Sequence, residues 1–306
     1  MYRSAAYGLV RDVYGLDRSD GEVAGMGRQT TTRKTQSQQQ DDRPEAWRCY
    51  GRLVKLFREQ AQLTQSALAD GVGYSYEQTS SIEQGRRPAK YTFTEAAERV
   101  LGARGALLAL QEEVELAKLP RFFQDFAKIE LEAVSRFQYE PQLVPGLLQT
   151  EEYARAVFSG HVPQLEPELF EQHLEARMER QKLLTRTPKV QFSFVVWEPV
   201  LRNPVGGPAI LRSQLRRLVE VTKLPNVEIQ VVPMRAGMHP GLNGPMVLLE
   251  TQGHRRVAYL ESQDTGVVIT EAHTVSDFGL RYGKLRSQAL NIEESARLIE
   301  LAGGEQ

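Results

Sequence analysis

A run of polar side chains between Ser75 and Gln84 carries hydrogen-bonding groups through which the chain could contact another molecule. The run predicts a short helix whose inner side is formed by Thr79 and Ile82. The side chains expected on the outer side are those of Tyr76, Glu77, Ser80, Ser81 and Gln84. A basic run, Arg86-Arg87-Pro88, follows at once. Hydroxyl, carboxylate and amide groups can read base edges in a groove of DNA, and cations can bind the phosphates.

Two helices joined by a glycine-containing turn are expected to present these groups. The hydroxyl of Thr64 can cap the first helix, and Gly71 and Gly73 are expected to bracket a turn in which positive φ costs glycine little. Ser75 and Gln78 have the spacing of a capping box at the start of the second helix, which Gly85 ends. This pattern predicts a helix-turn-helix, in which the second helix lies in the major groove.

Amphipathic stripes on both sides complete a five-helix unit over residues 44–103. Apolar residues recur at intervals of three and four along a helix upstream, at Trp47, Tyr50, Val54, Phe57 and Ala61. A second stripe follows downstream, at Phe93, Ala96, Ala97, Val100 and Leu101. Residues 104–119 are expected to form a helical linker.

The chain from about residue 50 to residue 101 resembles the xenobiotic-response-element type of helix-turn-helix domain, a group that includes phage repressors. The matching motifs are Leu63-Thr-Gln, Leu68-Ala69 and Ser-Ile-Glu-Gln-Gly at 81–85. The resemblance implies contacts to the DNA backbone from Gln65, Ser75 and Gln84. It also implies that Tyr76, Glu77 and Ser81 read bases. Glu can accept from cytosine N4, Ser is permissive, and Tyr can donate or stack on a thymine methyl.

Charge on this module is nearly balanced. Residues 44–103 hold eight basic and seven acidic side chains, a net charge of +1. Glu77 and Glu83 are expected to repel phosphates. Attraction must then come from the placement of the cations Arg86, Arg87, Lys90, Arg52 and Lys55. Modest affinity of one module predicts that the protein binds DNA as a homodimer. The alternative is a helix-turn-helix retained only for protein interaction.

The whole chain has 306 residues and a net charge of −1, which fits two domains and gives no sign of a histone-like or membrane-surface protein. Cys49 is the only cysteine, so an intramolecular disulfide and zinc-finger spacing are excluded. No apolar run reaches the length of a membrane span, and no signal-peptide pattern is present at the N-terminus. These features predict a cytoplasmic protein.

Residues 1–43 are expected to form a disordered tail, because the segment around residues 27–42 has almost no apolar side chains. One alternative is a basic arm, with Arg28, Arg33 and Lys34 touching DNA. Another is that translation begins at Met26.

Residues 120–303 are predicted to form an α/β regulatory domain with a mixed sheet and packed helices, so that the chain is a multi-domain protein. Between residues 105 and 187 the net charge is −5 and the pattern is helical. Strand patterns follow at residues 191–196, 227–231, 246–249 and 257–260, and helical patterns begin at Pro208, Val275 and Ile292.

This second domain resembles an actinobacterial domain of unknown function that follows a helix-turn-helix in the WhiJ-like, antitoxin-like group of regulators. The matching segments are Val144-Pro-Gly-Leu-Leu-Gln-Thr-Glu-Glu-Tyr-Ala-Arg, Glu175-Ala-Arg-Met-Glu-Arg-Gln and Gln230-Val-Val-Pro. The resemblance implies a domain that dimerises and receives a signal or a small partner protein encoded nearby. The alternatives are an antitoxin-like protein that sequesters that partner and a repressor that senses a small molecule.

No catalytic motif is present, so we expect no enzyme, cofactor or bound metal. The five histidines lack metal-ligand spacing. An alternative is a metal site formed by carboxylates near predicted strand ends, at Glu198, Glu250, Glu261 and Asp264. The glycine-rich segment 236–245 is expected to connect two strands. As an alternative it covers a ligand pocket, with His239 and Asn243 as polar contacts.

Overall fold

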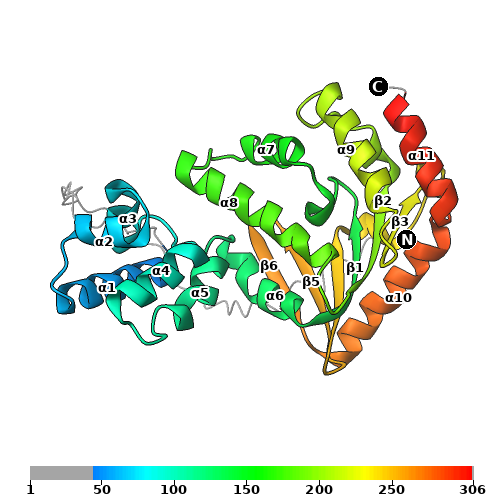
Figure 1. Cartoon of the computed structure of the whole chain (residues 1–306). Helices are drawn as coiled ribbons and strands as arrows, with labels where there is room; N and C mark the ends of the chain where they lie inside the picture. Colours follow the sequence, from blue (N-terminus) through cyan, green and yellow to red (C-terminus); the bar gives the residue numbers. More distant parts are fainter. Residues whose placement is uncertain (1–43, 305–306) are drawn as a thin grey trace, which may run out of the picture. The chain divides into compact units, whose positions relative to one another are not determined.

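The computed structural model describes residues 44–304 (Figure 1). The predicted tail over residues 1–43, the alternative arm of Arg28, Arg33 and Lys34, and the alternative start at Met26 lie outside the described residues. The described residues belong to one compact unit.

Helices alone build the first part of this unit. They are α1 (Glu45–Gln60), α2 (Gln65–Val72), α3 (Tyr76–Glu83), α4 (Tyr91–Leu101), the 3-10 turn η1 (Leu108–Leu110) and α5 (Gln111–Leu116). Their apolar stripes meet in one core around Trp47, Tyr50, Leu68 and Phe93. The predicted all-helical module is confirmed, although four of its α-helices lie within residues 44–103 and the fifth, α5, lies beyond them.

The core of this helical module extends beyond residue 103. Leu107 and Val114 are fully buried in it, and the indole N–H of Trp47 donates to the carbonyl of Val114 at 3.0 Å. Residues up to Ala117 thus pack as part of the module, in the stretch for which a linker is expected.

The predicted caps are present. The hydroxyl of Thr64 accepts from the amide of Ala67 at 3.1 Å, and Ser75 and Gln78 form a complete capping box. Gly73 has a φ of 73°, a conformation that L side chains rarely adopt, whereas Gly71 lies within α2 and not in the turn. These interactions satisfy amide groups that the first turns of α2 and α3 would otherwise leave without partners.

A buried ion pair fastens α3 to α1. The Arg58 guanidinium donates to both carboxylate oxygens of Glu83, at 2.9 and 2.7 Å, and the Glu83 side chain is only 2% exposed. The expectation that Glu83 repels phosphates is therefore wrong. Its charge faces inward, because a cation 25 positions earlier in the chain neutralises it there.

A six-stranded mixed sheet forms the centre of the second part. Its strands are β1 (Ala133–Glu140), β2 (Gln191–Trp197), β3 (Val227–Val232), β4 (Met246–Thr251), β5 (Arg256–Ser262) and β6 (Thr265–Ile269). The strand order is β3-β2-β1-β4-β5-β6. The pairs β1–β2 and β2–β3 are parallel, and the three pairs from β1–β4 to β5–β6 are antiparallel. The predicted mixed sheet with packed helices is confirmed.

Helices cover both faces of this sheet (Figure 1). They are α6 (Arg121–Leu131), α7 (Glu151–Ser159), α8 (Pro167–Arg180), α9 (Pro208–Val221), α10 (Ala272–Gln288) and α11 (Ile292–Gly304). Short 3-10 turns connect them, at Gly146–Leu148, Gln181–Leu184, Glu198–Leu201, Met234–Ala236 and Pro240–Asn243. Apolar residues of α6, α7, α9 and α11 share one core with one face of the sheet, and this face is called the α9 face. Residues of α10 form the core of the other face, the α10 face.

Side chains alternate between these faces along each strand. Val247 and Leu249 lie in the core of the α9 face, whereas Met246 and Leu248 lie in that of the α10 face. Strands β2 to β5 match the predicted alternation. The expectation of a helical pattern throughout residues 105–187 is wrong at β1, which is a central strand of the sheet.

We predict that Arg58→Met lowers the free energy of unfolding of the helical module by roughly 3–5 kcal/mol, because Glu83 is left buried without its cation. Urea unfolding of the full chain, followed by Trp47 fluorescence in a Trp197→Phe background, measures this loss. Lys55→Met is the matched control on the same helix, since Lys55 pairs with Glu59 at the surface and should contribute less than about 1 kcal/mol. Equal losses for both variants would contradict the assignment.

Candidate nucleic-acid interface

One side of α3 is exposed and polar. Ser75, Glu77 and Gln84 are exposed, Tyr76 is 51% exposed and Ser81 is half-buried. The expectation that Ser80 faces outward is wrong, because it is 7% exposed and accepts from the Gln84 amide at 3.0 Å. With Glu83 paired internally, Glu77 is the one carboxylate of α3 left on its outer side.

A close approach of backbones sets the position of α3. A Cβ atom added to Gly51 in α1 would lie 2.4 Å from the carbonyl oxygen of Glu83, and one added to Gly85 would lie 2.8 Å from the Cα of Arg48. Only glycine permits these contacts. Together with the Arg58–Glu83 ion pair, they hold the end of α3 against α1, so that its outer side is presented rigidly.

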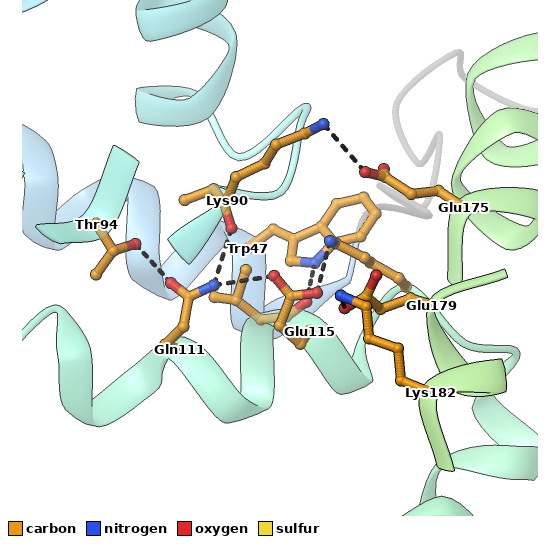
Figure 2. Close-up of polar contacts among 11 residues, drawn as sticks. Trp47, Lys90, Thr94, Gln111, Glu115, Glu175, Glu179 and Lys182 are labelled. Atoms are coloured by element: carbon orange, nitrogen blue, oxygen red, sulfur yellow. Dashed lines mark hydrogen bonds and ion pairs between the residues drawn. The ribbon is translucent and has the colours of Figure 1, made fainter. Parts of the chain in front are cut away.

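The basic run after α3 is also held in place by the module. Ala89 is fully buried, and its carbonyl accepts from the Gln111 amide at 3.1 Å. The oxygen of that amide accepts from Thr94 at 2.5 Å, and its nitrogen also donates to Glu115 at 3.0 Å (Figure 2). This network fixes the backbone between two surface cations, Arg87 and Lys90, while leaving their side chains exposed.

The other predicted DNA contacts lie on exposed or partly exposed positions. Arg86 is exposed directly after Gly85, and Gln65 is half-buried at the first residue of α2. Of the two cations expected on α1, Arg52 pairs with Glu45 at 3.1 Å and Lys55 with Glu59 at 3.9 Å. The cations after α3 therefore have fewer partners within their own module than those of α1.

Acids of α8 lie opposite these cations. Lys90 reaches Glu175 at 3.1 Å (Figure 2), and Arg87 lies 3.9 Å from Glu168. Both pairs border a hollow of about 610 Å³, which Gln78 of α3 also lines. All four charged side chains are about half exposed or more, so the pairs are surface interactions that a competing anion can replace. The sequence contains no signal for these contacts, because they join residues about eighty positions apart.

The two residues considered as ligand contacts lie in different environments. His239 is buried, edge-on to Tyr139 and Trp197, and neither of its ring nitrogens has a hydrogen-bond partner within the described chain. Burial lowers the pKa of His239. Asn243 is exposed. A shared ligand for this pair stays a prediction.

The carboxylates considered as metal ligands have separate partners. Glu198 accepts from the amide of Met234 and pairs with Arg202, whereas Glu250 pairs with His254 and Arg256. Glu261 accepts from Tyr259, and Asp264 lies 3.4 Å from His161. Within residues 44–304, no group of three or more His, Cys, Asp or Glu side chains is arranged to hold a metal ion.

A cluster of buried charges in the second domain was not predicted. Glu130 of α6 accepts from Arg136 of β1 at 2.8 Å and from Arg180 of α8 at 2.7 Å. Burial opposes ionisation of Glu130, but the two guanidinium groups together lower its pKa. Arg136 also donates to Gln138, which in turn donates to Glu140 at 2.9 Å. Polar residues therefore occupy the α9 face of β1.

These features define a protein with an N-terminal helix-turn-helix domain and a C-terminal α/β domain. Residues 50–111 match the family of helix-turn-helix domains. Residues 123–301, more than half of the chain, match the family described as a domain of unknown function, DUF5753. The chain belongs to this family. No curated protein and no solved structure matches it significantly.

A helix-turn-helix domain indicates a DNA-binding regulator rather than an enzyme. Among the described helices, none combines the length and the apolar character needed to cross a membrane.

We predict that stability falls with pH because of Glu140. Burial raises the pKa of Glu140 to about 7, and Glu261 adds to the rise, although the Gln138 hydrogen bond opposes it. The unfolded carboxyl ionises near 4.5, so the folded state loses stability as pH rises from about 4.5 to about 7, with no further loss above that. Glu140→Gln should reduce the loss between about pH 5 and pH 8 by roughly 1–3 kcal/mol. Chemical denaturation at both pH values measures it, with the exposed Glu152→Gln as control. A wild-type pH profile in Glu140→Gln would refute this cause.

Proposed function

We propose that the protein is a sequence-specific transcriptional regulator that binds double-stranded DNA with α3 in the major groove. The observation that carries the proposal is the exposed polar side of α3, fixed at its start by a capping box and followed at its end by exposed cations. The N-terminal ends of α2 and α3 also carry the positive end of the helix dipole, which favours phosphate binding.

The proposed base contacts are made by Tyr76, Glu77 and Ser81, and the proposed phosphate contacts by Gln65, Ser75, Gln84, Arg86, Arg87 and Lys90. The two roles need different properties. Base readers must lie on the groove side of α3, whereas phosphate contacts can lie at helix starts and in the turn after α3. Ser75 can serve as cap and contact together, because its oxygen accepts from Gln78 while its O–H remains able to donate.

We further propose that the regulator acts as a homodimer of the xenobiotic-response-element type, and that its second domain belongs with the WhiJ-like, antitoxin-like group. Residues 44–103 have a net charge of only +1 and attract phosphates weakly, so two modules are needed for useful affinity. The second domain would set the separation of two recognition helices, which must match half-sites about one helical turn apart (~34 Å).

Signal reception by the second domain is supported by the contacts of α8. Glu168 and Glu175 occupy Arg87 and Lys90, two of the proposed phosphate contacts. Phosphates and these carboxylates therefore compete for the same cations. A signal or partner protein that moves α8 would change DNA affinity without touching α3.

Selection of bound duplexes from a random DNA pool by the purified full chain, near physiological salt, tests the DNA-binding proposal. Enrichment of an inverted repeat is expected, and its spacing reports the separation of the two modules. Enrichment of a single half-site would refute the homodimer. No enrichment would refute sequence-specific binding by the protein alone and favour the antitoxin-like alternative, in which a small partner protein is the main ligand.

We predict that the two groups of contacts respond differently to substitution. Tyr76→Ala with Glu77→Ala should change which sequence is selected, because base readers are lost. Arg86→Ala with Arg87→Ala should weaken binding to all sequences by about tenfold or more, and reduce the slope of log affinity against log salt by about 1–2. Fluorescence anisotropy over a salt series measures both. Equal changes in sequence preference for both pairs would show that the roles are misassigned.

We also predict that Glu168→Gln with Glu175→Gln raises DNA affinity by about 3- to 30-fold at low salt, because Arg87 and Lys90 are released. Anisotropy titrations measure the change. Glu293→Gln with Glu300→Gln on α11 is the matched control, since it alters net charge equally at exposed positions of the last helix. A gain of the same size in the control would mean that net charge alone, and not the α8 contacts, determines affinity.

A further inference from the structure

The second domain contains a cavity of about 300 Å³ over the α9 face of the sheet. The proposed binding of DNA by α3 does not use this cavity. Its floor includes Gln138 and Glu140 of β1 and Glu261 of β5, and Arg177 of α8 lines another wall. The volume is at the lower end of small-molecule sites and suits a ligand of the size of an amino acid rather than a dinucleotide.

Arg177 is the cation of this cavity that has no carboxylate partner. Among the described residues, none forms an ion pair with it, and its interactions are a hydrogen bond to the Gln149 side chain at 3.0 Å and a stacking contact over Phe158 at 4.5 Å. Burial lowers the pKa of Arg177 to about 10, so the group is still protonated at neutral pH. Its remaining N–H donors are available to a planar anion.

Two carboxyl groups of the cavity likewise lack cationic partners at ion-pair distance within residues 44–304. Glu140 accepts only from the Gln138 amide, and Glu261 only from the Tyr259 hydroxyl at 3.2 Å. Burial raises the pKa of both. They lie on the same face and at the same end of the sheet, since β1 and β5 both run antiparallel to β4.

The buried charges next to the cavity, by contrast, are paired with one another. Glu130 is saturated by Arg136 and Arg180 at 2.7–3.2 Å. Arg177 and Glu140 are half-buried and Glu261 is exposed, and Arg177 attracts both carboxyl groups without coming within ion-pair distance of either. A guanidinium and two carboxyl groups that line one cavity without direct pairing can bind the opposite charges of a ligand. Aromatic rings complete the lining, including Phe123 and Phe158.

We propose that this cavity binds a small zwitterion of the amino-acid class with an apolar side chain. Arg177 binds the ligand carboxylate, Glu140 and Glu261 bind the ammonium group, and the aromatic wall encloses the side chain. A phosphate dianion fits less well, because the two carboxyl groups would repel its second charge.

Helix α8 contacts both the cavity and the helical module, so ligand binding can affect DNA binding through α8. This inference rests on the proposed function. Positions 173, 177 and 180 form one stripe of the helix and line the cavity. Glu168 and Glu175, seven residues apart, form a stripe on the opposite side and meet Arg87 and Lys90. A ligand bound by Arg177 therefore contacts α8, the helix whose carboxylates compete with phosphate for Arg87 and Lys90.

Calorimetry and thermal unfolding of the full chain with matched probes test the proposal. The probes are L-phenylalanine, phenethylamine and hydrocinnamate, together with L-leucine, isoamylamine and isocaproate. At least one amino acid should bind and raise Tm, and its analogues that lack either charge should bind roughly tenfold or more weakly. Binding at neutral pH should release protons, because the ammonium group lowers the pKa of Glu140.

Variants then locate the site. Arg177→Lys keeps the charge but loses the planar fork, and Arg177→Gln loses both, so affinity should fall in that order. Arg155→Gln on α7 is the control, since the Arg155 side chain is 43% exposed and pairs with Glu151 and Glu171 at the surface. The proposal is overturned if neither amino acid binds, if hydrocinnamate binds as tightly as L-phenylalanine, or if both Arg177 variants bind normally. DNA selection by the same protein is scored separately, so failure of DNA binding and failure of this site are distinguishable.

Discussion

The buried carboxylate of Glu130 is the interaction on which the arrangement of the second domain depends. It joins α6, the central strand β1 and α8, because Arg136 and Arg180 both donate to it. Removing any member would leave charge in a site where burial opposes it. With these elements tied together, Arg136, Gln138 and Glu140 must line the α9 face of β1. The same tie holds α8 where one side borders the cavity and the other meets the helical module.

The helix-turn-helix could be predicted because its determinants are local. A cap such as Thr64, the capping box of Ser75 and Gln78, and the positive φ of Gly73 each act within a few residues. Strands β2 to β5 could be predicted for a similar reason, since each carries the two-residue alternation of a sheet with apolar cores. In both cases local preference and tertiary packing agree.

Elements whose polar residues are buried could not be predicted in this way. In strand β1, Arg136, Gln138 and Glu140 alternate with Phe137 and Tyr139, but the side of the strand that carries the polar residues is also covered by the fold. Its charges are tolerated only through partners on α6 and α8, which no local pattern reveals. The inward orientation of Glu83 could not be predicted for the same reason, because its partner Arg58 lies on another helix. The local sequence pattern and the fold therefore disagree at two places: at β1, which lines the cavity, and at the ion pair that holds α3 against α1.

The exposure of the α8 ion pairs limits how strongly the two domains can influence each other. Surface pairs of this kind contribute about 0–1 kcal/mol each, so the two together can change DNA affinity by about tenfold rather than abolish it. Such coupling is also reciprocal: whatever moves α8 is itself bound more or less tightly, by the same factor, once DNA occupies the helical module. A regulator built on these contacts would give a graded response, set jointly by the concentrations of operator and effector.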